Sequence, residues 1–464
     1  MKYGLGEAWG QVVGTLEDFR GELIHPGDPS YDEYRQVWNG SIDRRPGVIA
    51  RCTGVADVRS ALAYARRTGG PVAVRGGGHS FPGHSTCDGG IVLDLSPLKG
   101  IRVDPVRRTA RAQAGVLLGE LDRETQEFGL ATPAGIVTHT GLAGLTLGGG
   151  IGWLMRKHGL TIDNLLSVDV VTAEGELLTA DEEHNAELFW GIRGGGGNFG
   201  VVTEFEFQLH PVGPTVYAGI IAWPMEQSPE VMRFYRDWIK DVPDELTTAI
   251  VHRCLPSLPT IPSELHARPA VVVVVSYSGA VEDGERVVAP LKAFAPPMLD
   301  LCTARPFLSL QSMLDPTFPH GRWYYTRACD VDELTDEVID IAVERGQAID
   351  SPFSLFPIFQ LGGAISRVDP DSTAYGGRSH GHAFNFVGAT LGPDGFDAQR
   401  EWVRESSKAL EPHQAGVYIN FLTDEGSDRI RSAYGATTYD RLQALKQKYD
   451  PGNLFHLNQN IPPS

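Results

Sequence analysis

Cysteine is scarce in this chain, and the few that occur are not arranged for metal or redox chemistry. Only five are spread over 464 residues: Cys52, Cys87, Cys254, Cys302 and Cys329. No C-x-x-C pair occurs, although cysteines at that close spacing are the usual mark of zinc and thiol–disulfide sites. The sequence therefore predicts free thiols that are buried or half-buried.

Positive charge and long apolar runs are also in short supply. The 40 Lys and Arg residues are outnumbered by 58 Asp and Glu residues, which leaves a formal charge of −18. This charge repels nucleic acid backbones and anionic lipids, so we expect neither nucleic acid nor membrane as a partner. No apolar run reaches the length of about 18 residues that a membrane span needs. Since the amino-terminal stretch MKYGLGEAWGQVVG lacks the apolar core of a secretory signal, a soluble, cytoplasmic protein is the expectation.

Two common catalytic motifs are missing as well. The phosphate-binding form G-x-x-x-x-G-K-[ST] does not occur, which removes the commonest type of nucleoside triphosphatase. The G-x-S-x-G turn that presents a hydrolase serine is also absent. Neither of these two enzyme classes is therefore favoured.

Glycine, by contrast, is abundant. The chain has 54 glycines, with clusters at 76–78, 148–150 and 194–197. From Pro46 to Leu209 short apolar runs alternate with helical patterns, as in GVIARCT, VADVRSALAYARRTG and PVAV. This strand, helix, strand order is typical of α/β structure, and Gly69 suits the left-handed end of the helix.

A second region, with a different pattern of strands and helices, runs from Pro214 to about Gln414. AGIIAWP, AVVVVVSYSG and SLFPIFQLGGAI predict strands, whereas SPEVMRFYRDWIKDV and DVDELTDEVIDIAVERG predict helices. The last stretch has the apolar segment GVYINF, a helix near TTYDRLQALKQKY, and the tail NLFHLNQNIPP. Because this tail is rich in apolar residues, we expect it to pack against the rest of the chain. A chain of this length predicts two or three domains.

One glycine cluster matches a nucleotide-binding pattern but has the wrong context. Gly195, Gly197 and Gly200 fit G-x-G-x-x-G. A nicotinamide dinucleotide site needs a helix directly after this motif, because the pyrophosphate rests on the helix amino end. The residues that follow, VVTEFEFQL, alternate between apolar and polar as a strand does. We therefore reject a nicotinamide-binding fold.

The stretch VRGGGHSFPGHS at 74–85 follows an apolar strand pattern and has two histidines. Consecutive glycines can leave a concave nest of amide N–H groups that suits a pyrophosphate, but a plain glycine turn explains the stretch equally well. A metal site built from His79, His84, His139 and His158 is disfavoured, because H-x-x-x-x-H in a glycine and proline loop matches no standard ligand set.

Four separated segments resemble one family. They are VRGGGHSFPGHS at 74–85, GLTLGGGIGWLMRKHGLTIDN at 144–164, ELFWGIRGGGGNFGVVTEF at 187–205 and YDPGNLFHLNQNI at 449–461. On these residues the chain resembles the berberine bridge enzyme-like FAD-linked oxidases of the vanillyl-alcohol oxidase type. The resemblance implies an α+β fold with α/β layers: a split FAD-binding domain of the PCMH type and an inserted substrate domain of antiparallel sheet plus helices. It places the FAD-binding domain at 1–212, with a core of about 42–212, the substrate domain at 213–414, and the completing segment at 415–464.

The resemblance also implies the residues that contact FAD. His79 is expected to bond covalently to the flavin 8α-methyl carbon, for which a neutral imidazole nitrogen is needed. His84 has no family role and is expected to be a surface-loop histidine without chemical function. The expected cofactor-binding residues are Arg75, Gly76, Gly77, Gly78, His79, Ser80, Gly115, Gly141, Gly144, Gly148, Gly149, Gly152, Trp153, Gly200, Val202, Asn420 and Asn458.

Two family features are missing from this chain. Many relatives have a second covalent link from a cysteine at the position of Val137, so a single link through His79 is expected. Relatives that oxidise hydroxyl groups often have a tyrosine where this chain has Ile151. The family pattern Tyr-x-Asn-Tyr is matched by Tyr418, Asn420 and Phe421 on an expected last strand, where alternation would put Tyr418 and Asn420 on one face. Tyr418 is the candidate catalytic residue, and a packed strand tyrosine is the alternative.

The activity implied is that of an FAD-dependent oxidase. FAD would take a hydride from a carbon that bears nitrogen or oxygen in a small organic substrate, and dioxygen would reoxidise it with release of hydrogen peroxide. The missing tyrosine at position 151 favours an amine or a secondary-metabolite intermediate over a sugar. A carbohydrate or alcohol oxidase, a flavin dehydrogenase with another acceptor, and a flavin-loaded binding protein remain alternatives. Possible pocket aromatics are Trp153, Trp323, Tyr324, Tyr325 and Phe359.

Overall fold

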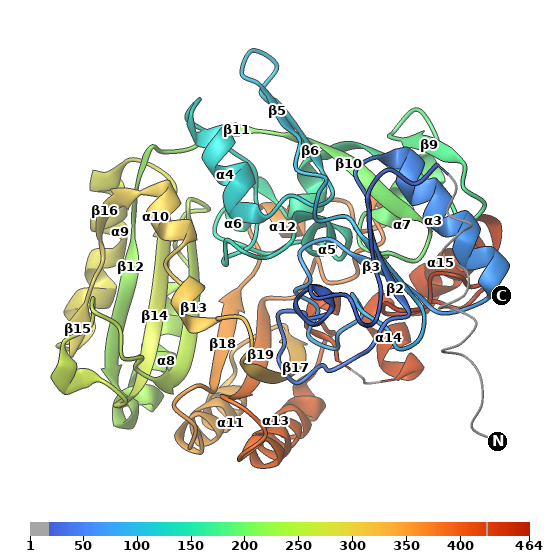
Figure 1. Ribbon diagram of the computed structural model, residues 1–464. Coiled ribbons are helices and arrows are strands. Elements are labelled where there is room, and N and C mark those ends of the chain that lie inside the picture. Colours follow the sequence, from blue (N-terminus) through green and yellow to red (C-terminus); the bar gives the residue numbers. More distant parts are fainter. Residues whose placement is uncertain (1–17, 424–425) are drawn as a thin grey trace.

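The computed structural model describes residues 18–423 and 426–464. The amino-terminal stretch, for which no secretory signal is expected, lies outside the described residues. Within them, no helix has the length and apolar character needed to cross a membrane. Figure 1 shows a mixed α+β molecule, with two small sheets toward the amino-terminal part and one large sheet beside them, as the expected fold class requires.

The first two sheets come from residues before Pro211. One has four strands: β1 (Glu22–Ile24), β2 (Val48–Arg51), β4 (Ile91–Asp94) and β3 (Val72–Arg75). The other has five: β5 (Ile101–Asp104), β6 (Thr109–Gln113), β10 (Val201–Gln208), β8 (Leu165–Val171) and β9 (Leu177–Ala180). Strands β2, β4 and β3 are parallel, and helix α3 (Val55–Thr68) connects β2 to β3 as the strand, helix, strand pattern predicts.

Short helices and a small strand pair complete this part. The helices are α2 (Tyr31–Tyr34), α4 (Leu118–Gln126), α5 (Leu142–Leu147), α6 (Met155–His158) and α7 (Ala186–Ile192), and the paired strands are β7 (Leu130–Ala131) and β11 (His210–Pro211). Gly69 ends α3 in the left-handed conformation (φ 69°), and its N–H donates to Ala65 O, as predicted. The residues after the GGGGNFG motif form strand β10, which confirms that no helix follows it.

The large sheet has eight strands. In spatial order they are β15 (Leu299–Asp300), β12 (Thr215–Pro224), β14 (Pro269–Tyr277), β13 (Leu246–Cys254), β18 (Leu355–Gln360), β19 (His382–Thr390) and β17 (Trp323–Val331), with β16 (Thr303–Pro306) also paired to β12. Its pairings are antiparallel. The remaining helices of this part are α8 (Ser228–Trp238), α9 (Val281–Phe294), α10 (Phe307–Gln311), α11 (Asp336–Gln347), α12 (Ala364–Arg367) and α13 (Phe396–Leu410).

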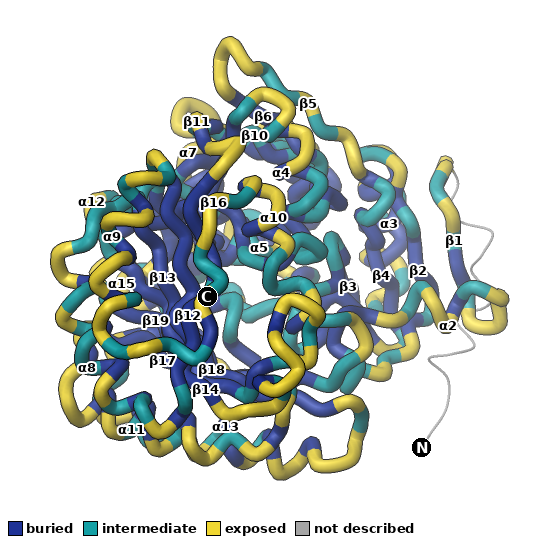
Figure 2. Tube along the Cα trace, turned by 90° about the vertical axis from the view of Figure 1, so that its left-hand side faces the viewer, coloured by how far each residue is buried: buried dark blue, intermediate teal, exposed yellow. Residues whose placement is uncertain are grey.

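Both faces of this sheet are buried, and Figure 2 shows its strands as a dark interior layer. On β14, Val271, Val273 and Val275 pack into the core beneath the helices, whereas Val272 and Val274 belong to a second core on the opposite face. This explains why AVVVVV is a continuous apolar run instead of an alternating one. The second face is the one that the cavity described below uses.

The carboxyl-terminal segment returns to the amino-terminal part. Helix α15 (Ala436–Tyr449) lies beside α7, and α14 (Ser427–Tyr434) packs against α15; both are red in Figure 1. The tail after them binds the glycine loop at 194–200: Asn458 Nδ2 donates to Gly197 O at 3.1 Å, and Ile461 N donates to Asn198 Oδ1 at 3.0 Å. The expectation that the tail packs back is confirmed. The exact domain boundaries at 212 and 414 stay a prediction.

Candidate active site

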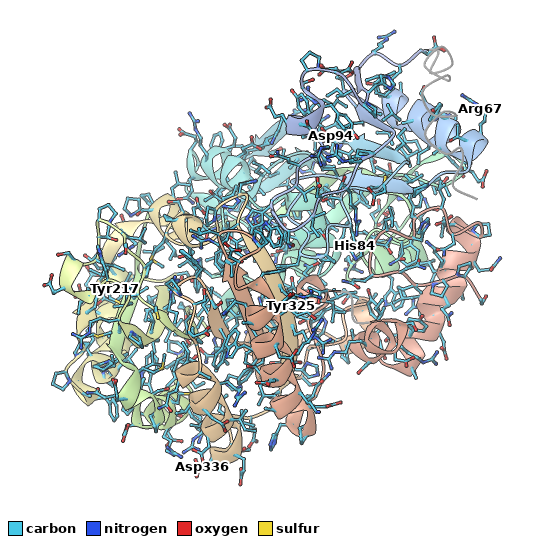
Figure 3. All side chains as sticks on the ribbon, turned by 60° about the horizontal axis from the view of Figure 1, so that its bottom comes forward. Arg67, His84, Asp94, Tyr217, Tyr325 and Asp336 are labelled. Atoms are coloured by element: carbon cyan, nitrogen blue, oxygen red, sulfur yellow. The ribbon has the colours of Figure 1, made fainter. Side chains whose placement is uncertain are left out.

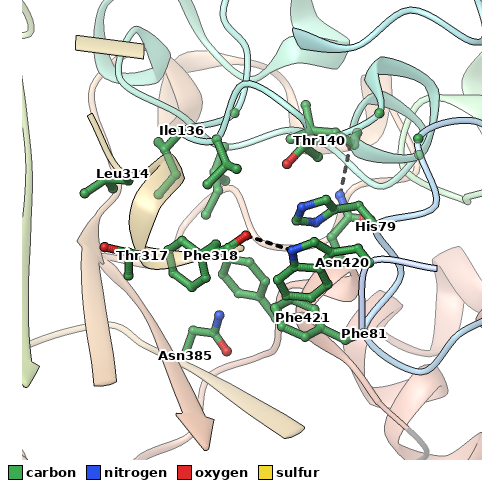
Figure 4. A pocket seen from close by; sticks show the side chains of 18 of the residues that line it. His79, Phe81, Ile136, Thr140, Leu314, Thr317, Phe318, Asn385, Asn420 and Phe421 are labelled. Atoms are coloured by element: carbon green, nitrogen blue, oxygen red, sulfur yellow. Dashed lines mark hydrogen bonds between the residues drawn. The ribbon is translucent and has the colours of Figure 1, made fainter. Parts of the chain in front are cut away.

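A cavity of about 1000 Å³ lies between the amino-terminal sheets and the large sheet. One side is lined by loop residues of the first part and by the carboxyl-terminal tail, and the other by side chains of β12, β13, β14, β18 and β19. Figure 4 shows side chains from both parts meeting there, with His79 and Asn420 on one side and Leu314 and Asn385 on the other. Segments far apart in the sequence therefore share one site.

The glycine loop after β3 forms part of the cavity wall. Gly76, Gly77 and Gly78 all line it. A Cβ on Gly77 would lie 2.5 Å from both Cα and N of Gly141, which is backbone that cannot give way cheaply. The loops at 76–78 and 141–144 therefore touch backbone to backbone, and only glycine at both contact positions allows this approach.

His79 follows directly and is enclosed by aromatic rings. Its ring stacks on Trp38 with a centroid distance of 4.1 Å and an interplanar angle of 18°. Trp38 is itself fixed, because it stacks on Tyr324 at 4.0 Å and its Nε1 donates to Phe318 O at 2.9 Å; this last bond is dashed in Figure 4. His79 is thus held by a rigid stack.

The two ring nitrogens of His79 have different surroundings. Nε2 lies 3.1 Å from Nδ1 of His139, and the ring also forms a hydrogen bond with the backbone of His79 itself. Burial, followed by the nearby charges of His139 and His320, lowers the pKa of His79 well below its usual value. The imidazole is therefore neutral at physiological pH. When Nε2–H donates to His139, the lone pair of the neutral ring is on Nδ1.

Tyr418 and Asn420 lie next to the second glycine cluster. The expected strand is wrong here: residues Ile419–Phe421 form a 3₁₀ turn, so strand alternation does not apply. The two side chains meet nonetheless, because Asn420 Nδ2 donates to Tyr418 Oη at 2.8 Å, and Gly150 N also donates to this oxygen at 2.9 Å. Burial raises the pKa of Tyr418 to about 12 despite these two hydrogen bonds, so the hydroxyl keeps its proton at neutral pH.

Most of the expected cofactor contacts line the cavity. These are Gly76, Gly77, Gly78, His79, Ser80, Gly141, Gly144, Gly148, Trp153, Gly200, Val202, Asn420 and Asn458, together with Tyr418. Four do not: Arg75, Gly115, Gly149 and Gly152. The Arg75 side chain points away from the cavity, because its guanidinium donates hydrogen bonds to the backbone oxygens of Tyr34 and Ser85. The glycines pack tightly instead; a Cβ on Gly152, for example, would lie 1.6 Å from Ala134 O.

His84 corrects a further expectation. It is not a surface-loop histidine, because its ring nitrogens are buried and its residue lines the cavity (His84 is labelled in Figure 3). The loop is folded inward by Arg44, whose Nη1 donates to the carbonyls of Gly83 and Thr86, each at 2.9 Å. Burial lowers the pKa of His84 to about 4. Neither ring nitrogen has a hydrogen-bonding partner in the described chain.

The chemistry of the lining fits FAD. One wall consists of glycine backbone that leaves room for a large planar or phosphate-bearing group. Buried polar atoms without partners belong to residues of the same wall, namely both ring nitrogens of His84, Ser85 Oγ and Asn458 Oδ1. Since buried polar groups are normally hydrogen-bonded, these atoms indicate a polar ligand.

Comparison with known proteins agrees that this chain binds FAD. A family model described as FAD binding domain matches residues 46–181, and one described as berberine and berberine-like matches 417–462. An FAD-linked oxidoreductase of Dictyostelium discoideum is 34% identical over 98% of this chain and 97% of its own. This chain belongs to the berberine bridge enzyme-like FAD-linked oxidoreductases. It is thus an FAD-dependent enzyme of the oxidase family.

Two further relatives carry names that mention substrates. The solved structure of 6-hydroxy-D-nicotine oxidase from Arthrobacter nicotinovorans has a TM-score of 0.88 and 28% identity, covering 97% of this chain and 100% of that one. A xylooligosaccharide oxidase of Thermothelomyces thermophilus is 26% identical over 92% of this chain and 89% of its own. Both span nearly the whole of this berberine bridge enzyme-like chain.

Sequence reasoning missed much of the substrate side. Trp323, Tyr324 and Tyr325 were candidate pocket aromatics but do not line the cavity; of the five candidates only Trp153 and Phe359 do. Tyr325 lies on β17 (Figure 3) under the guanidinium groups of Arg400 and Arg404. Arg253, Arg305 and Asn385 do line it. No motif marks them, because they reach the site only through the register of the large sheet.

Proposed function

We propose that this enzyme is an oxidase that removes a hydride from a C–N or C–O carbon of a small organic molecule. The observation that carries the proposal is the two-sided cavity, which has glycine backbone on one wall and mainly apolar side chains on the other, among them Val251, Val272 and Phe359. An apolar wall favours an amine or a secondary-metabolite intermediate over a sugar, since a sugar needs many polar partners. The 6-hydroxynicotine-type relative is in keeping with this choice.

FAD, when bound, supplies the redox chemistry by accepting the hydride and passing the electrons to dioxygen, with hydrogen peroxide as product. The residues proposed to hold it are those of the cavity wall at 76–80 and 141–148, with Gly200, Val202, Asn420 and Asn458. Gly76, Gly77 and Gly78 offer backbone N–H groups to the pyrophosphate. His84 and Ser85 add buried polar atoms that have no other partner.

We propose a single covalent link, from His79 Nδ1 to the flavin 8α-carbon. Support comes from the neutral ring, from the engagement of Nε2 by His139, and from the fixed stack on Trp38. Val137, at the position of the second linking residue of many relatives, lines the cavity with an apolar side chain and has no thiol to offer. His139 would act as a positioning residue that selects the reactive tautomer of His79.

Acid precipitation tests the link. The wild-type pellet should stay yellow, and His79→Ala should lose the colour to the supernatant. His184→Ala is the matched control, because its side chain is 70% exposed and far from any role in the site. A colourless wild-type pellet would mean that the flavin is not covalently bound.

Tyr418 is the proposed catalytic residue toward the substrate. Its hydroxyl oxygen already accepts two hydrogen bonds, so its proton points to another acceptor. To take up the hydroxyl proton of an alcohol substrate, Tyr418 would first have to release its own proton to solvent, and the hydrogen bonds from Gly150 N–H and Asn420 would stabilise the phenolate that remains. With a neutral amine no base is required, and Tyr418 would only orient the substrate.

Aerobic screening of the purified yellow protein against amines, phenolic alcohols and sugars tests the function. We expect peroxide formation with an amine or aromatic substrate and a smaller response with sugars. Reduction of an added dye acceptor under nitrogen, without oxygen consumption or peroxide formation in air, would assign a dehydrogenase instead. A flavin that no substrate bleaches would favour a binding protein and contradict the proposal.

A further inference from the structure

Two arginines approach one short segment at the substrate side of the cavity. Arg253, on β13, donates from Nη1 to Thr317 Oγ1 at 3.3 Å and from Nε to Cys254 O at 3.0 Å. Arg322 donates from Nη1 to the backbone oxygen of the same Thr317 at 3.0 Å. Arg253 and Thr317 both line the cavity, and Thr317 is labelled beside Phe318 in Figure 4. Two positive charges therefore flank one threonine.

No carboxylate of the described chain neutralises this pair. Neither Arg253 nor Arg322 takes part in a salt bridge within residues 18–423 and 426–464. Asp300, an acidic residue in the cavity lining, is paired with Lys292 Nζ at 2.8 Å. By contrast, the buried Arg378 elsewhere in the fold lies 2.7 Å from Asp163. Buried charges are normally paired in this way.

Arg253 is the more deeply buried of the two arginines. Its residue is 8% exposed, and burial followed by the charge of Arg322 lowers the pKa of its guanidinium to about 10. It is still protonated at neutral pH. Nη2 of Arg253 has no partner in the described chain, so one edge of the guanidinium remains available to a ligand in the cavity.

The surroundings of Arg253 are apolar. Val251 precedes it by two residues on the same face of β13, and Leu355 is its register partner on β18; both line the cavity. Arg253 lies four residues along β13 from Ala249, which pairs with Phe359 near Tyr418. At about 3.3 Å per residue this is a separation of roughly 13 Å. The positive group and Tyr418 thus mark two distant points of one apolar wall.

We propose that the substrate is an organic anion with an apolar body, whose carboxylate binds to Arg253 and the hydroxyl of Thr317. This inference rests on the proposed oxidase function and narrows its substrate class. The planar guanidinium suits a carboxylate, since the free edge can donate to it directly. Arg322 adds positive charge from behind Thr317 and does not itself line the cavity. A ligand carboxylate would supply the counter-charge that the protein lacks.

Calorimetric titration of the flavin-loaded enzyme with benzoate and with benzamide tests the inference. The two probes have the same ring and differ in charge. We expect benzoate to bind at least about tenfold more tightly, because hydrogen bonds between charged partners are the strong ones. Arg253→Met should abolish the preference, and Arg253→Lys should retain part of it. Arg268→Met, which removes an exposed arginine of the loop after β13, is the control that should leave it unchanged.

Equal affinity for the two probes, tighter binding of benzamide, absence of benzoate binding, or an unchanged preference in Arg253→Met would each overturn the inference. If Arg253→Met loses flavin or fails to fold, Arg322→Met replaces it, with a reduced preference expected. The calorimetric signal does not depend on turnover. A failed peroxide screen therefore leaves this test intact, and turnover of a neutral substrate without any benzoate preference would refute the anion site while the oxidase function stands.

Discussion

The contact between Gly77 and Gly141 offers a sharp test of the cavity wall. In Gly77→Ala the new methyl would start 2.5 Å from Gly141 Cα, and ordinary contact begins at 3.4 Å. The two loops would have to separate by about 0.9 Å, and overpacking of this kind costs about 1–3 kcal/mol of unfolding free energy. Because both loops line the cavity, we expect loss of bound flavin as well as lower stability.

Gly144→Ala is the matched control for this substitution. Gly144 lies inside helix α5 and lines the cavity, but a Cβ there has no neighbour within 4 Å. In a helix, alanine is favoured over glycine by up to about 1 kcal/mol, so the fold should be unharmed or slightly stabilised. The methyl would, however, project into the space proposed for FAD, and the flavin content should fall.

Two measurements separate these effects. Urea unfolding followed by tryptophan fluorescence gives stability, and the ratio of flavin to protein absorbance gives cofactor content. Gly77→Ala should lower both values, and Gly144→Ala only the second. Normal stability and flavin content in Gly77→Ala would refute the close backbone contact. Full flavin loading in Gly144→Ala would refute the placement of FAD against α5.

Two buried groups give further predictions. Burial raises the pKa of Asp122 to about 7. Between about pH 4 and pH 7 the folded state therefore holds a proton that the unfolded chain has released. The free energy of unfolding should fall by roughly 4 kcal/mol as the pH rises through this range. Asp122→Asn should match the wild type near pH 4 and be more stable at pH 7.5 in urea unfolding; identical pH profiles would count against the shift. Lys446 Nζ lies 2.7 Å from Asp450 Oδ2, and the two side chains are 0% and 1% exposed. Because Lys446→Met would leave the buried carboxylate unpaired, it should lower the free energy of unfolding by about 3–5 kcal/mol and loosen the tail. Lys448→Met on the exposed side of α15 is its control, and equal stability of the two variants would contradict the role of the buried pair.

Local patterns in the sequence were enough for most elements. The strand, helix, strand unit over 48–75 and the strand after Gly200 follow from periodicity and glycine placement, because these signals depend only on neighbouring residues. The segment at 418–421 is the exception: its apolar alternation is typical of a strand, but hydrogen bonds from Gly150 and Asn420 to Tyr418 accompany a tight turn there. A tertiary contact of this kind is invisible to a local pattern.

What the sequence by itself determined is the cofactor side of the protein: the glycine clusters, His79 and the Asn-rich tail form motifs whose spacing is read directly from the chain. The tertiary structure alone decided the environment of those motifs and the whole substrate side. His84 is buried because Arg44 draws its loop inward, and Arg253 reaches the cavity only through the register of an eight-stranded sheet. Non-local strand pairing brings together residues that no short stretch of sequence connects, and for this physical reason the charge that we propose to select the substrate became visible only in the folded chain.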